Sequence, residues 1–365
     1  MLPAKIIQHS KRAPESAVLA LKTGSICLKF SFFAAMLLFF QPAWSQIDFS
    51  DVDAFLKKNQ KALGTNVAVM VYKDGKVVFQ KVASDMFNTK TQAAVPGASK
   101  WFTAALVLTF VDEGKLKLDD PVSKYLPEMS KYMKNYITIR QCLSHTTGVE
   151  NNRGLFPGKK KFNMLEEEVN FYAAKEISNN AGEEFWYGSI GPNIVGRVLE
   201  VISKKTFDRL ATERLFRPMK MRGTTFVDFD GKAISPSAGA QSTAADLISF
   251  LSMILNKGMF ENKRILSEAS IAEMQKSQFI DKPVKYTPEG TEGLHHGLGA
   301  WLQEEDASGN GQVVSGLANF GTFPYVDNCR KYAAVLFVQN TVKDARKEIA
   351  KQFRDTIEAT MGSCK

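Results

Sequence analysis

Cysteine and histidine are both scarce in this sequence, with four of each among 365 residues. No spacing among them fits a metal site, so we expect neither a metal nor another cofactor. An oxidising compartment would permit a Cys329–Cys364 disulfide, although the sequence alone cannot place the two sulfur atoms close together. Cys142 lies in a segment of apolar spacing, so we expect it to be a small buried residue.

Long apolar runs are also rare, and the longest matters for targeting. The 11 residues Phe30–Phe40 are almost entirely apolar, follow a basic lead and precede Ala43-Trp44-Ser45. This pattern predicts a secretory signal peptide, residues 1–45, cleaved after Ser45. The alternative is an uncleaved membrane anchor, for which the run is short against a span of about 20 residues. We therefore expect secretion across the inner membrane, to the periplasm or the exterior, with no transmembrane span after signal removal.

Basic blocks are absent as well. The 47 Lys and Arg residues exceed the 38 Asp and Glu residues only mildly, and the surplus is spread along the chain. No basic stretch is interleaved with aromatic residues, so we do not expect nucleic acid as a partner. The remaining residues, 46–365, suit one large domain.

Hydrophobic periodicity predicts an antiparallel sheet built from both ends of that domain. A helix is expected at 51–63, followed by a β-hairpin whose Asp74-Gly75 turn separates strands 67–72 and 77–82. Further strands are predicted at 297–302, 320–326 and 332–338. Helices are predicted at 98–113, 137–143, 164–176, 190–203, 206–216, 244–255 and 344–360. This order excludes a doubly wound βαβ sheet and indicates an α/β fold of the α+β type, with a mostly helical region beside the sheet.

Two long blocks carry a family resemblance. The stretch SKWFTAALVLTFVDEGKLKLDDPVSKYLP, followed by ITIRQCLSHTTGV, resembles the β-lactamase-related family of class C-like β-lactamases, esterases and DD-peptidases. Later segments, such as GEEFWYGSIGPNIVGRVLEV, agree in order, so the resemblance covers roughly residues 50–362. It implies a β-lactamase/transpeptidase-like fold and serine-hydrolase chemistry that begins at a Ser-x-x-Lys motif.

The first motif lacks its nucleophile. Residues three apart share one helix face, so a lysine amine can take the proton of a serine one turn earlier. Three residues before Lys100, however, stands Gly97, which cannot be acylated. Ser99 lies about 200° round the helix from Gly97 and would point away from the cleft. We expect Lys100 to face the cleft, the alternative being an exposed lysine in the first helical turn.

The second motif is Tyr187-Gly188-Ser189. The resemblance implies that Tyr187 shares the general-base role with Lys100 and later protonates the leaving group, and that Ser189 donates a hydrogen bond to a substrate amide. The alternative is that Tyr187 belongs to an aromatic core cluster, since Phe185 and Trp186 precede it.

The third motif departs from the family. Where relatives carry Lys-Thr-Gly or His-x-Gly on the strand lining the cleft, this chain has Gly316-Leu317-Ala318, or Ser315-Gly316 with a shift of register. The cation that would bind a substrate carboxylate is missing. Gly316 and Ala318 remain the candidate substrate-binding positions.

Two histidine sites could suggest other chemistry. The resemblance makes His145 a structural turn residue rather than the base of a Ser/His pair. His295 and His296 are adjacent on a predicted strand and should face opposite ways, which argues against a shared ligand.

Together these features predict a secreted β-lactamase-related protein that is non-catalytic or strongly impaired. We expect it to bind a peptide, an acyl ester or a cell-wall fragment. The alternative is an active serine hydrolase, either a parent protein with serine at position 97 or one acting through Tyr187 or a Lys100-activated water. A third class is a structural, partner-binding envelope protein. The substrate and the oligomeric state stay open.

Overall fold

The structure is a computed structural model that describes residues 47–150, 162–227, 233–317, 321–339 and 346–364. The expected signal peptide, residues 1–45, lies outside the described residues. All elements below belong to one unit, Ile47–Lys365.

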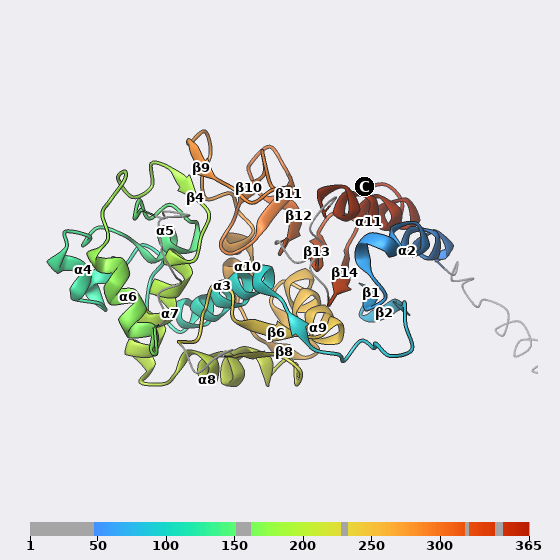
Figure 1. Cartoon of the computed structure of the whole chain (residues 1–365), viewed down its shortest axis with the longest axis horizontal. Helices are drawn as coiled ribbons and strands as arrows, with labels where there is room; N and C mark the ends of the chain where they lie inside the picture. Colours follow the sequence, from blue (N-terminus) through green and yellow to red (C-terminus); the bar gives the residue numbers. More distant parts are fainter. Residues whose placement is uncertain (1–46, 151–161, 228–232, 318–320, 340–345, 365) are drawn as a thin grey trace, which may run out of the picture. The chain divides into compact units, whose positions relative to one another are not determined.

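A seven-stranded antiparallel sheet joins the two ends of this unit, in the order β10-β11-β12-β13-β14-β1-β2 (Figure 1). Its strands are β1 (Val67–Lys73), β2 (Lys76–Val82), β10 (His295–His296), β11 (Trp301–Glu305), β12 (Gly311–Ser315), β13 (Phe323–Asp327) and β14 (Tyr332–Val338). The central pairing runs from Val67↔Val338 to Lys73↔Tyr332. Both faces of β14 are covered, which explains its unbroken apolar sequence YAAVLFV. The predicted fold class is confirmed.

Helices cover the two faces of the sheet, and β1 shows how the sequence divides between them. Val67, Val69 and Val71 pack with helices α2 (Ser50–Leu63) and α11 (Arg346–Met361) in one apolar cluster. Ala68 and Met70 belong to the other cluster, which contains helices α3 (Pro96–Asp112) and α9 (Ala244–Leu255). This alternation is the period-2 pattern of a strand that is buried on both faces.

Helix α3 passes through the core between the sheet and the helical region. All of its residues from Gly97 to Phe110 are buried, as expected for a helix that is hydrophobic all round. Pro96 occupies its first turn, where a missing N–H costs nothing. The helix therefore begins two residues before the predicted start. Phe102 packs edge-on against Phe250 of α9, with ring centroids 4.8 Å apart.

The helical region contains α4 (Glu128–Lys131), α5 (Ile139–Leu143), α6 (Leu165–Ala174), α7 (Ile190–Ser203), α8 (Phe207–Ala211) and, nearer the sheet, α10 (Glu268–Met274). Helices α5 and α7 approach closely at Gly191, where an added Cβ would lie 2.1 Å from the carbonyl oxygen of Cys142. Cys142 is buried and unpaired, as predicted, and burial raises the pKa of its thiol.

Two predicted elements differ in the structure, and one strand was not predicted. Of the strand predicted at 297–302, only Trp301 and Leu302 belong to a strand, β11; residues 297–300 connect β10 to β11, and Gly299 there takes a φ of +81° and lies against the Lys100 carbonyl. Strand β12 is not among the predicted strands. The helix predicted at 206–216 is α8 followed by a π-helical turn, Thr212–Phe216. Shorter strands pair in small sheets: β3 (Ala93–Ala94), β4 (Phe185–Trp186), β5 (Thr225–Phe226), β6 (Ala240–Ser242), β7 (Met259–Phe260), β8 (Lys263–Arg264) and β9 (Val284–Tyr286).

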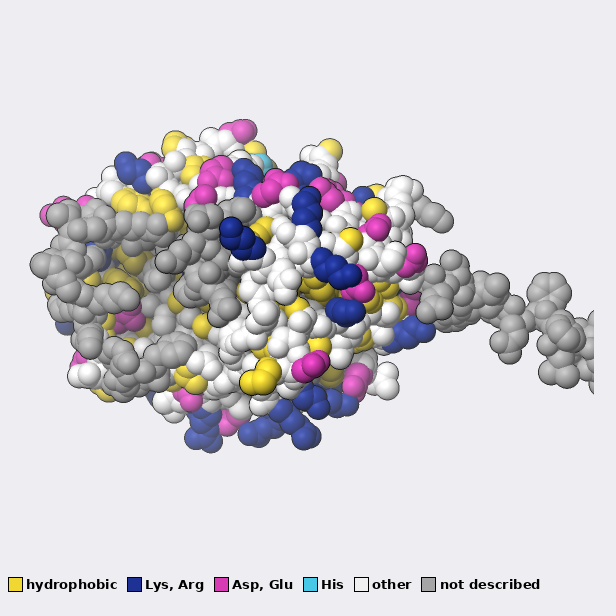
Figure 2. All heavy atoms as spheres, turned by 45° about the vertical axis from the view of Figure 1, so that its right-hand side comes forward, with side chains coloured by type: hydrophobic (Ala, Val, Ile, Leu, Met, Phe, Trp, Pro, Cys, Tyr) yellow, Lys and Arg dark blue, Asp and Glu magenta, His cyan; other side chains and the backbone are white. Residues whose placement is uncertain are grey.

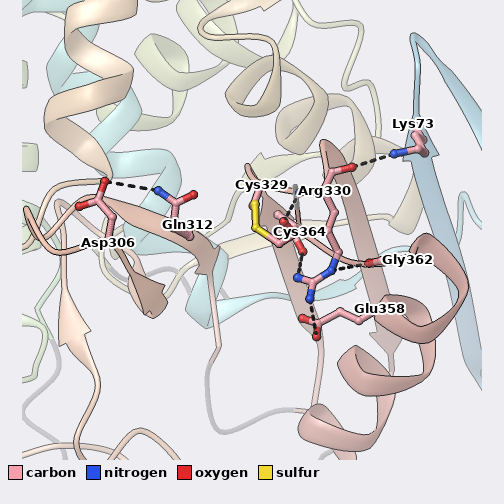
Figure 3. Close-up of a disulfide and its surroundings, with 9 residues drawn as sticks. Lys73, Asp306, Gln312, Cys329, Arg330, Glu358, Gly362 and Cys364 are labelled. Atoms are coloured by element: carbon pink, nitrogen blue, oxygen red, sulfur yellow. Dashed lines mark hydrogen bonds and ion pairs between the residues drawn. A yellow bond between two sulfur atoms is a disulfide. The ribbon is translucent and has the colours of Figure 1, made fainter.

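A disulfide between Cys329 and Cys364 joins the β13–β14 turn to the chain just beyond α11 (Figure 3). The guanidinium of Arg330 lies beside it, paired with Asp327 at 2.9 Å and with Glu358 at 3.5 Å. The end of α11 is therefore held to the β13–β14 turn by the disulfide and by the Arg330–Glu358 ion pair.

The described residues include no helix that combines the length and apolar character needed to cross a bilayer. On the face seen in Figure 2, Lys and Arg side chains are interspersed with Asp and Glu rather than gathered in one continuous band. This surface agrees with the even spread of charge along the sequence.

Candidate active site

The first turn of α3 presents Gly97 and Lys100 at the spacing of one helical turn. Gly97 is buried. The Lys100 side chain is 7% exposed, and its Nζ donates a hydrogen bond to the Ser237 carbonyl at 2.9 Å. Lys100 is thus buried rather than exposed on the first turn of the helix. Gly97, the position that the sequence resemblance assigns to the nucleophile, has no side chain.

Ser99 is fully buried and already bonded on both sides. Its hydroxyl donates to the Val95 carbonyl at 3.1 Å and accepts from the Ala240 backbone N–H at 3.0 Å. Ala240 belongs to β6, which packs beside the start of α3. The bond to Val95 lies within the first turn of α3, whereas the bond from Ala240 joins β6 to that turn, so the structure gives Ser99 a role in holding β6 against α3.

Tyr187 comes directly after β4 and is held by the backbone of β9. Its N–H donates to the Tyr286 carbonyl at 3.1 Å. The Nζ of Lys100 lies 4.7 Å from the centre of the Tyr187 ring, within the range of a cation–π interaction. The fold therefore brings together the lysine and the tyrosine that the sequence singles out as bases.

Aromatic and imidazole rings surround Tyr187. Its ring lies 4.5 Å from that of His145 and 5.1 Å from that of Trp301. His296 completes the group, 4.9 Å from His145 and 4.8 Å from Trp301. Tyr187 thus belongs to an aromatic cluster, as the alternative interpretation of the second motif has it, and it also contacts Lys100.

Both histidines of this cluster are neutral at neutral pH. Burial lowers the pKa of His145 well below 6.5, and the charges of His296 and Lys100 lower it further. Burial also lowers the pKa of His296, to about 3. The Gly188 N–H points at His145 Nδ1 at 3.4 Å, which assigns the proton to Nε2. Among these rings, Lys100 is the cationic group.

His145 and His296 are the site residues that sequence reasoning missed. His145 has a φ of +59° and so does occupy a turn, as expected, but its side chain also touches Tyr187. His295 and His296 face opposite ways, as predicted: His295 pairs with Glu305 at 2.8 Å, while His296 is buried beside Trp301. The alternation of a β-strand was the available signal that one of this pair points into the core.

Two of the three remaining predicted positions, Ser189 and Gly316, belong to the described residues. Ser189 stands before the first residue of α7 but makes no capping hydrogen bond with its side chain. Gly316 follows β12, and an added Cβ there would lie 3.2 Å from Trp101 and 3.6 Å from Ala98. Gly316 therefore packs against the start of α3. Ala318 lies outside the described residues.

The third motif shows no cation at its described positions. Ser315 and Gly316 are followed by Leu317, whose side chain is buried. Strand β12 has neighbours on both sides up to Ser315, which pairs with Trp301 and Tyr325. Among the described residues, no group of three or more His, Cys, Asp or Glu side chains is arranged to hold a metal.

The sheet made of both chain ends, the buried lysine one turn into α3 and the tyrosine ring against its amine define a β-lactamase/transpeptidase-like fold. The comparison with protein families agrees. The family model for Beta-lactamase matches residues 55–356, and the chain belongs to this family.

Three relatives illustrate the similarity. A Bacteroides dorei protein of known structure, described provisionally as a β-lactamase, is 27% identical, with a TM-score of 0.78 over 87% of this chain and 100% of that one. Protein flp of Staphylococcus aureus strain MW2 is 26% identical over 49% of this chain and 38% of its own length. Penicillin-binding protein 4 of Amycolatopsis lactamdurans is 26% identical over 57% of this chain and 64% of its own. The chain thus spans less than two thirds of these two curated relatives.

Proposed function

We propose that this chain is a secreted member of the Beta-lactamase family that binds a peptide, an acyl ester or a cell-wall fragment beside Lys100 and Tyr187 without being acylated. The observation that carries the proposal is Gly97. This residue, which has no side chain, lies one helical turn before Lys100. The Ser99 hydroxyl already donates to the Val95 carbonyl and accepts from the Ala240 N–H.

The groups that remain can bind but cannot form the acyl bond. The Lys100 ammonium can donate to a carbonyl or carboxylate oxygen of a ligand, and the Ser189 hydroxyl can donate to a ligand carbonyl or accept from an amide N–H. Acyl transfer also needs a nucleophile that the base can deprotonate. The family carries this nucleophile one turn before the lysine, where this chain has Gly97. We expect a ligand to bind reversibly and leave unchanged.

Secretion is supported by two independent features. The N-terminal pattern of a basic lead, an apolar run and Ala43-Trp44-Ser45 fits a cleaved signal peptide. The Cys329–Cys364 disulfide fits an oxidising compartment. The N-terminal sequence of the exported protein tests this: it should begin at Gln46, whereas an intact N-terminus would indicate an uncleaved anchor.

The binding function is tested through Trp301, which lies against Tyr187 and His296. We expect its fluorescence to change saturably on titration with an acyl-D-alanyl-D-alanine peptide, a muropeptide or a p-nitrophenyl ester, with no hydrolysis. The Lys100→Met variant should lose this response. Hydrolysis by the unaltered protein that disappears in Lys100→Met would overturn the proposal.

One observation favours a second candidate, a protein that binds a macromolecular partner elsewhere on its surface. Lys100, Tyr187 and His296 are each at most 7% exposed, so the protein's own side chains already surround the lysine. If none of the three compounds changed the fluorescence of Trp301, this second candidate would be favoured.

A further inference from the structure

The segment Ser235–Ser237 lies between helices α3 and α7. From α3, Lys100 Nζ donates to the Ser237 carbonyl at 2.9 Å, and Thr103 Oγ1 donates to the Pro236 carbonyl at 2.7 Å. Lys100 and Thr103 are three residues apart, so they share one face of α3. The segment thus supplies two backbone acceptors to that face.

Helix α7 holds the same segment from the other side. The Ser237 backbone N–H donates to Asn193 Oδ1 at 3.0 Å. Three residues further along α7, Gly196 makes room for Pro236, since an added Cβ there would lie 2.4 Å from Pro236 Cγ. Asn193 therefore fixes the Pro236–Ser237 peptide, whose carbonyl accepts from Thr103. The next carbonyl, that of Ser237, is the acceptor for Lys100, so Asn193 restrains it through the Ser237 backbone.

Asn193 is itself fixed by helix α6. It is 1% exposed, and its side chain interacts with the Glu168 carboxylate and the Tyr172 hydroxyl of that helix. The Tyr172 hydroxyl also donates to a Glu168 carboxylate oxygen. With Asn193 Oδ1 directed to Ser237, its NH₂ group is the donor left for these oxygens. A chain of polar contacts therefore leads from Glu168 through Asn193 to the Ser237 N–H, and the carbonyl of the same residue accepts from Lys100.

We propose that Asn193 and Glu168 are positioning residues that fix the Lys100 ammonium in the site through the backbone of Ser237, whose N–H Asn193 holds and whose carbonyl Lys100 contacts. The inference deepens the proposed function, because Lys100 is the cation through which the site would bind its ligand. Asn193 lies outside the three sequence motifs, six residues after Tyr187 and on a different element.

The physical consequence of breaking the chain is specific. In Asn193→Ala the buried Ser237 N–H loses its acceptor, and the segment can leave the position that Thr103 and Lys100 require. The Lys100 ammonium then loses a fixed hydrogen bond in a buried setting, which lowers its pKa and makes its amine more reactive. The titratable side chains that face it, Tyr187, His145 and His296, are unchanged in the variant.

The test is competitive acetylation by trace acetic anhydride between pH 6 and 11, with each lysine quantified by peptide mapping. Lys134 is the internal reference, since it is also buried and donates to the carbonyls of Ala173 at 2.8 Å and Lys175 at 2.6 Å, at the end of α6. In Asn193→Ala and Glu168→Gln we expect Lys100 acetylation at pH 8 to rise roughly tenfold, the size of one lost hydrogen bond to a charged group, and its titration midpoint to fall. Lys134 should not change, and Glu167→Gln, exposed on the same turn of α6, should match the parent.

Unchanged Lys100 acetylation in both variants would overturn the inference. A rise at Lys100 and Lys134 together would also overturn it, because the chain would then hold α6 rather than Lys100. The assay uses no ligand of the site and does not depend on an acyl-enzyme. Hydrolysis by the unaltered protein would therefore reject the proposed function while leaving this result standing.

Discussion

The Nζ of Lys100 lies 4.7 Å from the centre of the Tyr187 ring, although the two residues come from helix α3 and from the loop after β4. Each is fixed by its own backbone contact: Lys100 by the Ser237 carbonyl and Tyr187 by the Tyr286 carbonyl. The lysine and the tyrosine thus lie together although Gly97, one helical turn before Lys100, has no side chain. This arrangement is the basis of our proposal that the site binds a ligand without being acylated.

Ser99 gives the first prediction. Ser99→Ala should destabilise the protein by about 1–3 kcal/mol, because the buried Ala240 N–H loses its acceptor. Urea unfolding measures this free energy. The matched control is Ser189→Ala, whose hydroxyl makes no capping bond and which should change stability by no more than about 0.5 kcal/mol. A Ser99→Ala variant as stable as the parent would show that the β6 contact contributes nothing.

The buried histidines give the second prediction, which concerns pH. Because burial lowers the pKa of His145 well below 6.5 and that of His296 to about 3, the unfolded chain takes up these protons first. The stabilisation of the folded protein that comes from keeping these two histidines neutral is fully present above pH 6.5 and is lost as the pH falls from 6.5 toward 3. Each histidine contributes a slope approaching about 1.4 kcal/mol per pH unit to the free energy of unfolding.

Urea unfolding between pH 4.5 and 7.5 measures that slope. In His296→Gln the acid-side slope should be shallower by about one proton's contribution. If His296→Gln showed the same slope as the parent, a protonatable group elsewhere would have to carry the acid sensitivity.

Much of the sheet could be predicted from the sequence because its signals are local. Strands β1, β2 and β14 are runs of β-branched and aromatic residues, and Asp74-Gly75 marks the hairpin turn between the first two. Strand β12 escaped prediction because it is short and its Gly311-Gln312 start resembles a loop. The π-helical turn after α8 escaped because its residues have the same apolar spacing as an α-helix.

The site was harder to predict because it depends on contacts between distant segments. The Gly97, Lys100 and Tyr187 positions follow from motif spacing and resemblance. His145 and His296 join them only because β10 and the turn after α5 meet beside β4. Asn193 has no motif at all, and its role depends on the Ser237 peptide, which belongs to a loop.

The disulfide gives the third prediction. Cys329 and Cys364 are separated by 35 residues, and a bond closing a loop of that size stabilises a protein by about 2–4 kcal/mol. A reductant should therefore lower the melting temperature of the parent to that of the Cys329→Ser/Cys364→Ser variant and leave the variant unchanged. Alkylation of the denatured, unreduced protein at either cysteine would show that the bond is absent.

The central claim is that the missing side chain at position 97 alone prevents acylation, and intact-mass analysis tests it most directly. The parent and the Gly97→Ser variant are each incubated with a fluorescent penicillin and with a fluorophosphonate. We predict no adduct on the parent and a single adduct at position 97 on the variant, abolished by adding Lys100→Met. An adduct on the parent would contradict the claim by revealing another nucleophile. No adduct on a folded variant would contradict it by showing that the site has lost more than its serine.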